Sequence, residues 1–425
     1  MSSILTAAFT GTVFLAALRK LPPLHPTQIW SGSWAIATTL YALRLLPYRN
    51  LSWLTAGLIC GGVVAFAAGA GLGARLAGRR RVRRIATNEV EVVELAAWLS
   101  IALLALSLTA FLAQLVSRYG VTRVLRISPE VKFYLSSGEA PLSGTYVEVA
   151  IAAAAICGLA AALATARGAR WRWLFAALAC SGSVYFSTSR AFIVVALIVG
   201  LAALVVAGMS VNRRLLVTGA LAGGIAVVAI FIGLGAVLGK TYRNSTIGGF
   251  DNFFARHPAV SSLALPYQEA TASIPALDLL TGVSSTWGIA HGCATVPIAC
   301  GALRKLGVPA MRVPVTGPFT KAPLQWNGYT SLERFLIDGG TALALVLVAT
   351  SGVIAGFSWA RARAGSAGGI VIYAIIVPAL VAAYRQNLIE LVLIAAAIGV
   401  GLLLLASLLS GLRDPFVRRA AKWVT

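Results

Sequence analysis

The sequence predicts an all-α polytopic membrane protein with about eleven transmembrane helices and one large external loop. Two features of its composition carry that prediction. Of the 425 residues, 59% are hydrophobic and 11% are charged, and the mean hydropathy is +0.85. A soluble globular domain carries roughly a quarter charged residues, so a chain this apolar lacks the polar surface that water requires.

Apolar runs of roughly the length that crosses a bilayer, about 20 residues, recur along the chain. They lie at 4–18, 29–47, 53–76, 90–116, 144–166, 172–187, 190–209, 215–238, 333–359, 368–384 and 388–411. The first run has no small-residue cleavage site behind it, so we expect a span and not a removed signal peptide. These runs define an N-terminal bundle of about eight helices at 1–238, a loop at 239–332, and C-terminal helices with a basic tail at 333–425.

Short basic clusters fall between these runs, and alternating spans place all of them on one side. The clusters are Arg19 with Lys20, then Arg79, Arg80, Arg81, Arg83 and Arg84, then Arg167, Arg170 and Arg172, then Arg213 and Arg214, then Arg361 and Arg363, and last Arg413, Arg418, Arg419 and Lys422. The positive-inside rule makes that side cytoplasmic, with the N-terminus outside and the C-terminus inside. The net charge of +22 therefore reflects span orientation, and we expect no nucleic-acid partner.

The external side still keeps nearly half of the 35 lysines and arginines. Long loops are weakly bound by the charge rule, so this surplus does not contradict the topology. A basic surface beside a membrane suits an anionic substrate, such as a lipid-linked phosphate or pyrophosphate. The charge distribution therefore directs the search for a site to the external segments.

Two tight polar turns interrupt the spans on that side. In the first, at 187–190, Arg190 opens a transmembrane helix, where its charge opposes the helix dipole; it either serves an anionic ligand or snorkels to the headgroups. The second, at 384–387, carries Arg385, with Glu390 one turn later. Charged side chains at a membrane border need a partner or an aqueous cavity, so Arg385 either pairs with Glu390 or a lipid, or faces a ligand.

The large loop at 239–332 is far longer than a connection requires, and such loops are functional or disordered. Its aromatic content argues against disorder; the aromatic residues are Tyr242, Phe250, Phe253, Phe254, Tyr267, Trp287, Phe319, Trp326 and Tyr329. Its ionisable residues include Asp251, Arg256, His257, Glu269, Asp278, His291, Arg304, Lys305, Arg312 and Lys321. Prolines divide it into short segments, and 290–306 is expected to form a short interfacial or re-entrant helix.

The sequence lacks the motifs of several common enzyme and binding-site classes. The sequence contains no phosphate-binding glycine loop, no His-Glu-x-x-His or Cys/His cluster and no Gly-x-Ser-x-Gly elbow, so we expect no bound metal or cofactor. Cys60, Cys157 and Cys180 lie inside apolar runs. Cys293 and Cys300 share a loop and are able to pair, but a helix would hold them too far apart, so we expect small apolar fillers.

The segment that starts at Trp326, Trp-Asn-Gly-Tyr-Thr-Ser-Leu-Glu-Arg-Phe-Leu-Ile-Asp-Gly-Gly, resembles the Asn-x-Tyr-Thr and Asp-Phe-Gly signature of the Wzy-type O-antigen polymerases. The upstream stretch from Gly292 to Thr295, followed by Leu-Arg-Lys-Leu-Gly-Val, is similar to another stretch of that family. The turns that hold Arg190 and Arg385 also resemble the family's. The likeness covers the C-terminal half, and Gly339 departs from it where many members have Phe.

The resemblance implies a GT-C-like glycosyltransferase of the bacterial inner membrane. Such enzymes use undecaprenyl-pyrophosphate-linked oligosaccharides to build O-antigen, the surface polysaccharide of lipopolysaccharide. The expected partners are that lipid-linked substrate, membrane lipids and a chain-length regulator protein. The residues expected to bind pyrophosphate or stabilise the leaving group are Arg190, Arg243, Arg256, Arg312 and Arg385. The base is expected among Glu269, Asp278, His257 and His291. Asn327, Tyr329 and Asp338 are expected to shape the sugar site or to lock the loop onto the helices.

Three other functions are compatible with a polytopic membrane protein and differ in the features they require. An O-antigen ligase would share the architecture and the basic external face but hand finished glycan to another acceptor. A transporter or flippase of lipid-linked sugars would place charges near the membrane centre and show repeats between its halves. Here the charges cluster at helix ends. A scaffold subunit of an envelope assembly would use the aromatic loop as a docking surface.

Overall fold

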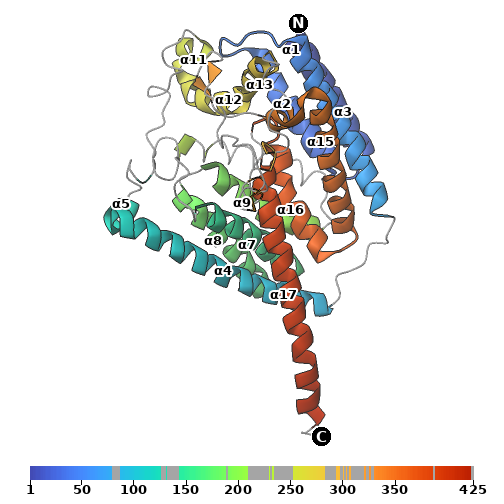
Figure 1. The fold of residues 1–425 in the computed structure, drawn as a ribbon, viewed down its shortest axis with the longest axis vertical. Coiled ribbons are helices and arrows are strands. Elements are labelled where there is room, and N and C mark those ends of the chain that lie inside the picture. The colour runs from blue at the N-terminus through green and yellow to red at the C-terminus, as the bar shows by residue number, and fades with distance from the viewer. Residues whose placement is uncertain are drawn as a thin grey trace. The chain divides into compact units, whose positions relative to one another are not determined.

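The computed structural model describes residues 1–78, 87–125, 131, 143–187, 190–208, 229, 232–233, 252–282, 293–296, 300, 303, 306–307, 320–321, 325–326, 330–385 and 388–422. Helices dominate these residues (Figure 1). The strands among them are β1 (Thr320–Lys321) and β2 (Gln325–Trp326), which pair antiparallel. The prediction of an all-α membrane fold therefore holds at the level of secondary structure.

Every predicted apolar run other than 215–238 corresponds to a helix; that run lies outside the described residues except for 229, 232 and 233. The helices are α1 (Ser2–Lys20), α2 (Pro26–Leu43), α3 (Trp53–Leu76), α4 (Thr87–Tyr119), α7 (Ser143–Leu163), α8 (Arg167–Ser183) with the 3₁₀ turn η1 (Val184–Ser187), α9 (Arg190–Gly208), α15 (Ser331–Arg363), α16 (Ala367–Val381) and α17 (Ile389–Lys422). A short helix, α5 (Val121–Leu125), follows α4.

Within the described residues, 7 helices are long and apolar enough to cross a membrane: α1, α3, α4, α7, α9, α15 and α17. This confirms the membrane character. Helix α16 is apolar but has only 15 residues. The total of eleven spans therefore stays a prediction.

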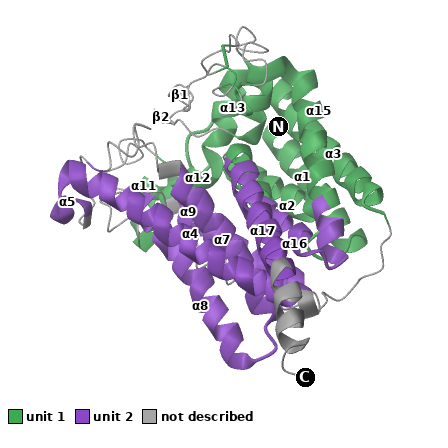
Figure 2. Cartoon of the chain, turned by 60° about the horizontal axis from the view of Figure 1, so that its bottom comes forward, with its two compact units in different colours: residues 1–78, 212–357, 379–390 green, residues 79–211, 358–378, 391–425 purple. Residues whose placement is uncertain are grey.

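The chain divides into two compact units, which Figure 2 colours separately. Unit 1 comprises residues 1–78, 212–357 and 379–390. Unit 2 comprises residues 79–211, 358–378 and 391–425. Each unit is built from segments that are distant in the sequence.

In unit 1, close backbone contact joins α3 to α15. A Cβ added to Gly69 would lie 2.0 Å from the carbonyl oxygen of Ala349, and one added to Gly352 would lie 2.4 Å from that of Phe66. The same relation holds one turn along each helix, at Gly73 and Gly356. Small residues at this spacing let membrane helices approach until their backbones touch. Both helices therefore depend on their glycines.

Helix α2 packs beside them through polar and aromatic groups. Its Trp30 stacks on Phe66 of α3 with ring centroids 4.4 Å apart. Its Thr38 lies 2.9 Å, oxygen to oxygen, from Thr10 of α1, and both hydroxyls also bond to backbone carbonyls of their own helices. These two hydroxyl groups are tolerated inside an apolar bundle because each has such a partner.

In unit 2, α7 is the most buried helix, and small residues fill it from Ala152 to Ala155. A Cβ added to Gly158 would lie 2.3 Å from the carbonyl oxygen of Gly200 on α9. Tyr146, near the start of α7, stacks on Phe111 of α4 with ring centroids 4.4 Å apart. Small side chains and one aromatic pair therefore hold the neighbouring helices against α7.

Candidate functional site

The segments of unit 1 that the charge pattern assigns to the external side gather at one end of that unit. The Ser2 hydroxyl donates to the Leu51 carbonyl at 2.6 Å, which joins the N-terminus to the loop between α2 and α3. The amide of Phe253 donates to the Leu45 carbonyl at 3.2 Å, which joins the large loop to the same place. These contacts agree with the predicted relative sidedness of the segments, while the compartment they face stays a prediction.

The described part of the large loop forms short helices: α11 (Phe253–Arg256), the 3₁₀ helix η4 (Pro258–Leu263), α12 (Ala264–Thr271) and α13 (Ser273–Thr281). Tyr267 anchors α12, because its hydroxyl donates to the Leu40 carbonyl at 2.8 Å and accepts from the Leu45 amide at 3.1 Å. Burial raises the pKa of Tyr267 to about 12. The hydroxyl of Tyr48 lies 3.0 Å from that of Thr271, which adds a second anchor.

Asp278 fixes α13 to the start of α3. One of its carboxylate oxygens, Oδ1, accepts from the Ser52 amide at 2.8 Å, the Ser52 hydroxyl at 2.7 Å and the Thr55 hydroxyl at 2.6 Å. An acidic group at a helix N-terminus is also favoured by the helix dipole. The structure therefore places this predicted candidate base in an anchoring position.

Arg385 and Glu269 form an ion pair between the turn after α16 and helix α12. The guanidinium Nε donates to Oε2 of Glu269 at 2.9 Å, and Nη2 donates to the same oxygen. The two side chains are 26% and 27% exposed. The sequence suggested Glu390 or a lipid as the partner of Arg385, and in the structure Arg385 pairs with Glu269. Arg385, which is predicted to bind pyrophosphate, and Glu269, a predicted base, are thus in contact.

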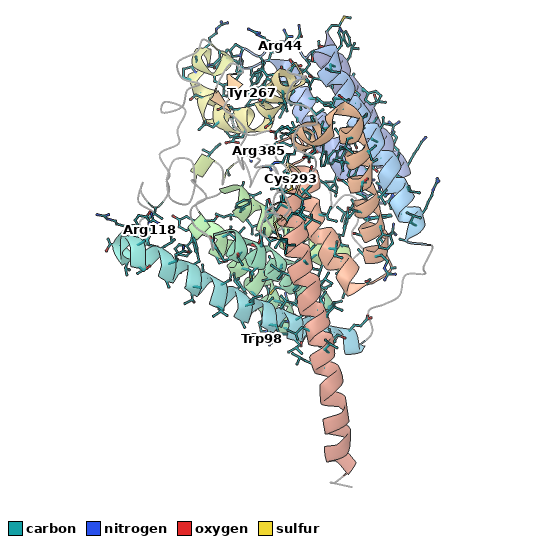
Figure 3. The ribbon with its side chains drawn as sticks, viewed as in Figure 1. Arg44, Trp98, Arg118, Tyr267, Cys293 and Arg385 are labelled. Atoms are coloured by element: carbon teal, nitrogen blue, oxygen red, sulfur yellow. A yellow bond between two sulfur atoms is a disulfide. The ribbon has the colours of Figure 1, made fainter. Side chains whose placement is uncertain are left out.

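The turn that carries Arg385 is tied to two other segments. The Ser273 hydroxyl at the start of α13 donates to the Arg385 carbonyl at 3.2 Å. The Ser331 amide at the start of α15 donates to the Ala383 carbonyl at 2.8 Å. Figure 3 labels Arg385 together with Tyr267 and Cys293 of the same unit. The ion pair therefore lies where α12, α13, α15 and the turn after α16 meet.

The first turn of α15 packs against α3 beyond the first residues of that helix. Leu332, in the first turn of α15, comes within 3.5 Å of the position that a Cβ on Gly62 would take. Gly62 is about 14 Å along α3 from Trp53, at roughly 1.5 Å per residue. If α3 spans the bilayer from Trp53, the first turn of α15 therefore lies within the span.

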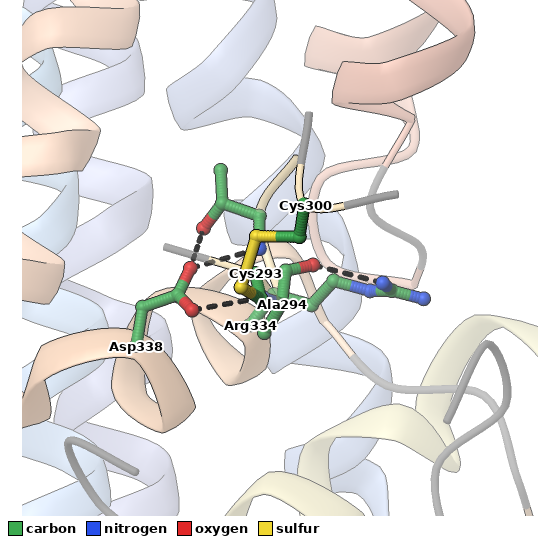
Figure 4. The surroundings of a disulfide bond; sticks show 6 residues. Cys293, Ala294, Cys300, Arg334 and Asp338 are labelled. Atoms are coloured by element: carbon green, nitrogen blue, oxygen red, sulfur yellow. Dashed lines mark hydrogen bonds between the residues drawn. A yellow bond between two sulfur atoms is a disulfide. The ribbon is translucent and has the colours of Figure 1, made fainter. Parts of the chain in front are cut away.

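Cys293 and Cys300 form a disulfide, so the expectation that they are unpaired apolar fillers is wrong (Figure 4). A helix across this stretch would have held the two cysteines apart. Residues 293–295 form a turn instead, and the two Cα atoms are 5.5 Å apart. That separation is within the range that a disulfide bridges. The free cysteines in the described residues are Cys60, Cys157 and Cys180.

Asp338 holds this disulfide-closed turn. Its two carboxylate oxygens accept from the amides of Ala294 at 2.9 Å and Thr295 at 2.8 Å, and one also accepts from the Thr295 hydroxyl. Arg334, one turn earlier on α15, donates to the Ala294 carbonyl at 2.8 Å. Directly after Asp338, α15 breaks at Gly339 and Gly340, and Gly340 has a φ of 69°. Asp338 thus fixes the 293–295 turn to α15 at the point where that helix breaks.

The other predicted residues are less informative. His257 is exposed, with its ring 4.2 Å from that of Phe253 and its Nδ1 2.8 Å from the Phe253 carbonyl oxygen; Arg256 beside it is also exposed. Arg190 begins α9 in unit 2, with a side chain outside the described part. The remaining predicted site residues lie outside the described residues altogether: Arg243, His291, Arg312, Asn327 and Tyr329.

Sequence reasoning missed the part played by Thr330, Ser331 and Arg334 at the start of α15. A signal was present, because Thr330-Ser331-Leu332-Glu333 has the form of a helix-capping box directly before an apolar run. Thr330 and Ser331 are buried. Their side-chain oxygens have no hydrogen-bond partner in the described part of the chain.

Comparison with protein-family models, with curated proteins and with solved structures finds no match. The resemblance to the polymerases therefore rests on the sequence motifs alone. The contacts around Arg385 are observed in the structure and do not depend on those motifs.

Proposed function

We propose that this chain is a membrane glycosyltransferase that polymerises undecaprenyl-pyrophosphate-linked oligosaccharide repeat units on the periplasmic face of a bacterial inner membrane. The observation that carries the proposal is the Arg385–Glu269 pair, where four segments of unit 1 meet. An arginine about three-quarters covered by protein suits a leaving pyrophosphate, because its planar guanidinium binds phosphate oxygens in pairs. The eleven spans, the GT-C-like arrangement and a chain-length regulator as partner are part of this proposal.

In the proposed reaction, a hydroxyl oxygen of the acceptor repeat unit attacks the anomeric carbon of the donor glycan. The bond from that carbon to the pyrophosphate oxygen breaks, and polyprenyl pyrophosphate leaves with the bonding electrons. Arg385 stabilises the charge that develops on the leaving group. The hydroxyl proton passes to a base, and Glu269 is a predicted base that contacts Arg385. No metal has a role in this scheme.

The disulfide supports the external placement of the site. Disulfides persist in oxidising compartments such as the bacterial periplasm and are rare in the cytosol. The positive-inside rule assigns the same loop to the external side from different evidence. Two independent arguments therefore favour a periplasmic Cys293–Cys300 turn.

A genetic experiment tests the proposal. Deleting the gene should leave single repeat units on the surface carbohydrate, and Arg385→Ala or Arg190→Ala should reproduce that phenotype at normal protein level. Arg118→Ala is a matched control, because Arg118 is an exposed external arginine at the end of α4 that lies over the ring of Tyr119. Normal polymer from the two test variants would contradict the pyrophosphate assignment. Polymer stranded on the carrier lipid would indicate the ligase instead.

A further inference from the structure

The start of α15 carries two buried hydroxyl groups that no group in the described part of the chain pairs with. Thr330 is 0% exposed and Ser331 is 6% exposed. In the described residues, neither side-chain oxygen has a hydrogen-bond partner. Buried polar groups are nearly always hydrogen-bonded, and leaving one unpaired costs stability. Two adjacent exceptions at one helix end therefore point to a ligand.

The sequence around Thr330 would normally give its hydroxyl a partner within the helix. In a Thr-x-x-Glu capping box, the threonine hydroxyl accepts from the amide three residues later. Here the Glu333 amide donates to the backbone carbonyl of Thr330 at 3.2 Å, so the Thr330 hydroxyl does not take part in the cap. This hydroxyl is therefore able to donate a hydrogen bond to a ligand.

Arg385 lies next to this helix start. The Ser331 amide donates to the Ala383 carbonyl, and the Arg385 amide donates to the Ala382 carbonyl, both at 2.8 Å. The N-terminal end of a helix also attracts anions, because its first amides and its dipole favour negative charge. The turn that carries Arg385 is therefore bonded to a helix N-terminus that holds two buried hydroxyl donors.

We propose that the start of α15 is a phosphate subsite, in which Thr330 and Ser331 bind one phosphate of the lipid-linked pyrophosphate while Arg385 binds the other. This inference rests on the proposed function and adds to it a basis for selecting a diphosphate over a monophosphate. Both hydroxyl oxygens are shielded from solvent, so the headgroup must enter the protein rather than rest on its surface. A polyprenyl monophosphate occupies the Arg385 position alone.

The experiment measures binding of three lipids to the purified full chain in detergent: polyprenyl pyrophosphate, polyprenyl monophosphate and phosphatidylglycerol. The Thr330→Val and Ser331→Ala variants remove the hydroxyls and nearly preserve side-chain size. The combined variant should bind the pyrophosphate about tenfold more weakly and the monophosphate within about twofold of the natural protein. Thr330→Ser, which keeps a hydroxyl, should retain the preference for the pyrophosphate.

Thermal unfolding supplies a readout that a purely structural hydroxyl would not give. Because the Thr330 hydroxyl is unpaired, Thr330→Val should raise the melting temperature by about 2–4 °C while weakening pyrophosphate binding. Thr38→Val is the matched control, since Thr38 is equally buried but hydrogen-bonded; it should lower the melting temperature and leave lipid selectivity unchanged.

Three outcomes overturn the subsite. The first is an unchanged pyrophosphate preference in the combined variant. The second is an equal loss of binding for all three lipids, and the third is a melting temperature that falls in Thr330→Val. A failure of the proposed function is distinct, because the natural protein would then bind neither polyprenyl lipid more tightly than phosphatidylglycerol.

Discussion

Replacing Glu269 with glutamine removes the negative charge that Arg385 contacts and keeps the shape of the side chain. The Nε and Nη2 atoms of Arg385 both donate to one oxygen of Glu269. The side chains are 26% and 27% exposed, so water screens this pair less than a surface pair and more than a fully buried one. Coupling energies are about 0–1 kcal/mol for exposed pairs, and breaking a buried pair costs about 3–5 kcal/mol. We expect about 1–2 kcal/mol here.

A double-mutant cycle measures that coupling. Glu269→Gln, Arg385→Gln and the combined variant are compared by thermal unfolding, where the expected coupling corresponds to a few degrees, about 2–5 °C. The Arg172–Glu94 pair of unit 2 is the matched control, because its atoms are 3.9 Å apart and its side chains are 51% and 40% exposed. That pair should show coupling close to zero.

The same variant tests how the pair relates to substrate. In Glu269→Gln, Arg385 no longer has a competing carboxylate, so polyprenyl pyrophosphate should bind several-fold more tightly, on the order of threefold to tenfold. If Glu269 is the base, this tighter binding will be accompanied by a loss of polymerisation. Weaker lipid binding in Glu269→Gln, or a coupling indistinguishable from that of the control pair, would refute the view that Arg385 is an anion-binding group held by Glu269.

Other contacts lead to further predictions. Asp278→Asn leaves three donors without their charged acceptor, so the melting temperature should fall by about 2–6 °C. Converting Cys293 and Cys300 to serine should lower both stability and polymer length, whereas reduction that leaves polymer unchanged would make the disulfide dispensable. The folded-state pKa of Tyr267, about 12, lies above the usual value near 10, so its stabilisation is complete below pH 10 and is lost as pH rises through 12. Tyr267→Phe should flatten that alkaline decline in melting temperature.

The helices were predictable from the sequence because one physical requirement fixes them: backbone groups in a bilayer must be hydrogen-bonded within the segment. The run predicted at 53–76 coincides with α3. The pattern of apolar residues predicts less well whether a helix crosses the whole membrane. Helix α2 holds buried Gln28, Ser31 and Ser33 and does not meet the length and apolarity of a full span. Apolar patterning identifies helices better than it identifies crossings.

The sequence predicted which types of residue form the candidate site but did not predict which of them contact one another. Arg385 and Glu269 are separated by 116 positions, and nothing local to either residue signals the other. The Cys293–Cys300 disulfide was missed because a helix was assumed where the chain turns. Asp338 was expected to shape a sugar site or to lock the loop onto the helices, and its hydrogen bonds to Ala294 and Thr295 fit the second role. The helix break at Gly340 beside it is visible only in the three-dimensional arrangement. Contacts across the chain are the part that sequence alone leaves open.

The central claim is that the chain transfers glycan from one polyprenyl pyrophosphate carrier to another. The most direct test reconstitutes the purified protein in liposomes with an undecaprenyl-pyrophosphate-linked repeat unit. Glycan length and released undecaprenyl pyrophosphate are then measured together. The account predicts a ladder of products, with one carrier released for each new glycosidic bond, and the loss of both signals in Arg385→Ala. Repeat units that cross the bilayer without lengthening, or a ladder that forms equally well in Arg385→Ala, would contradict it.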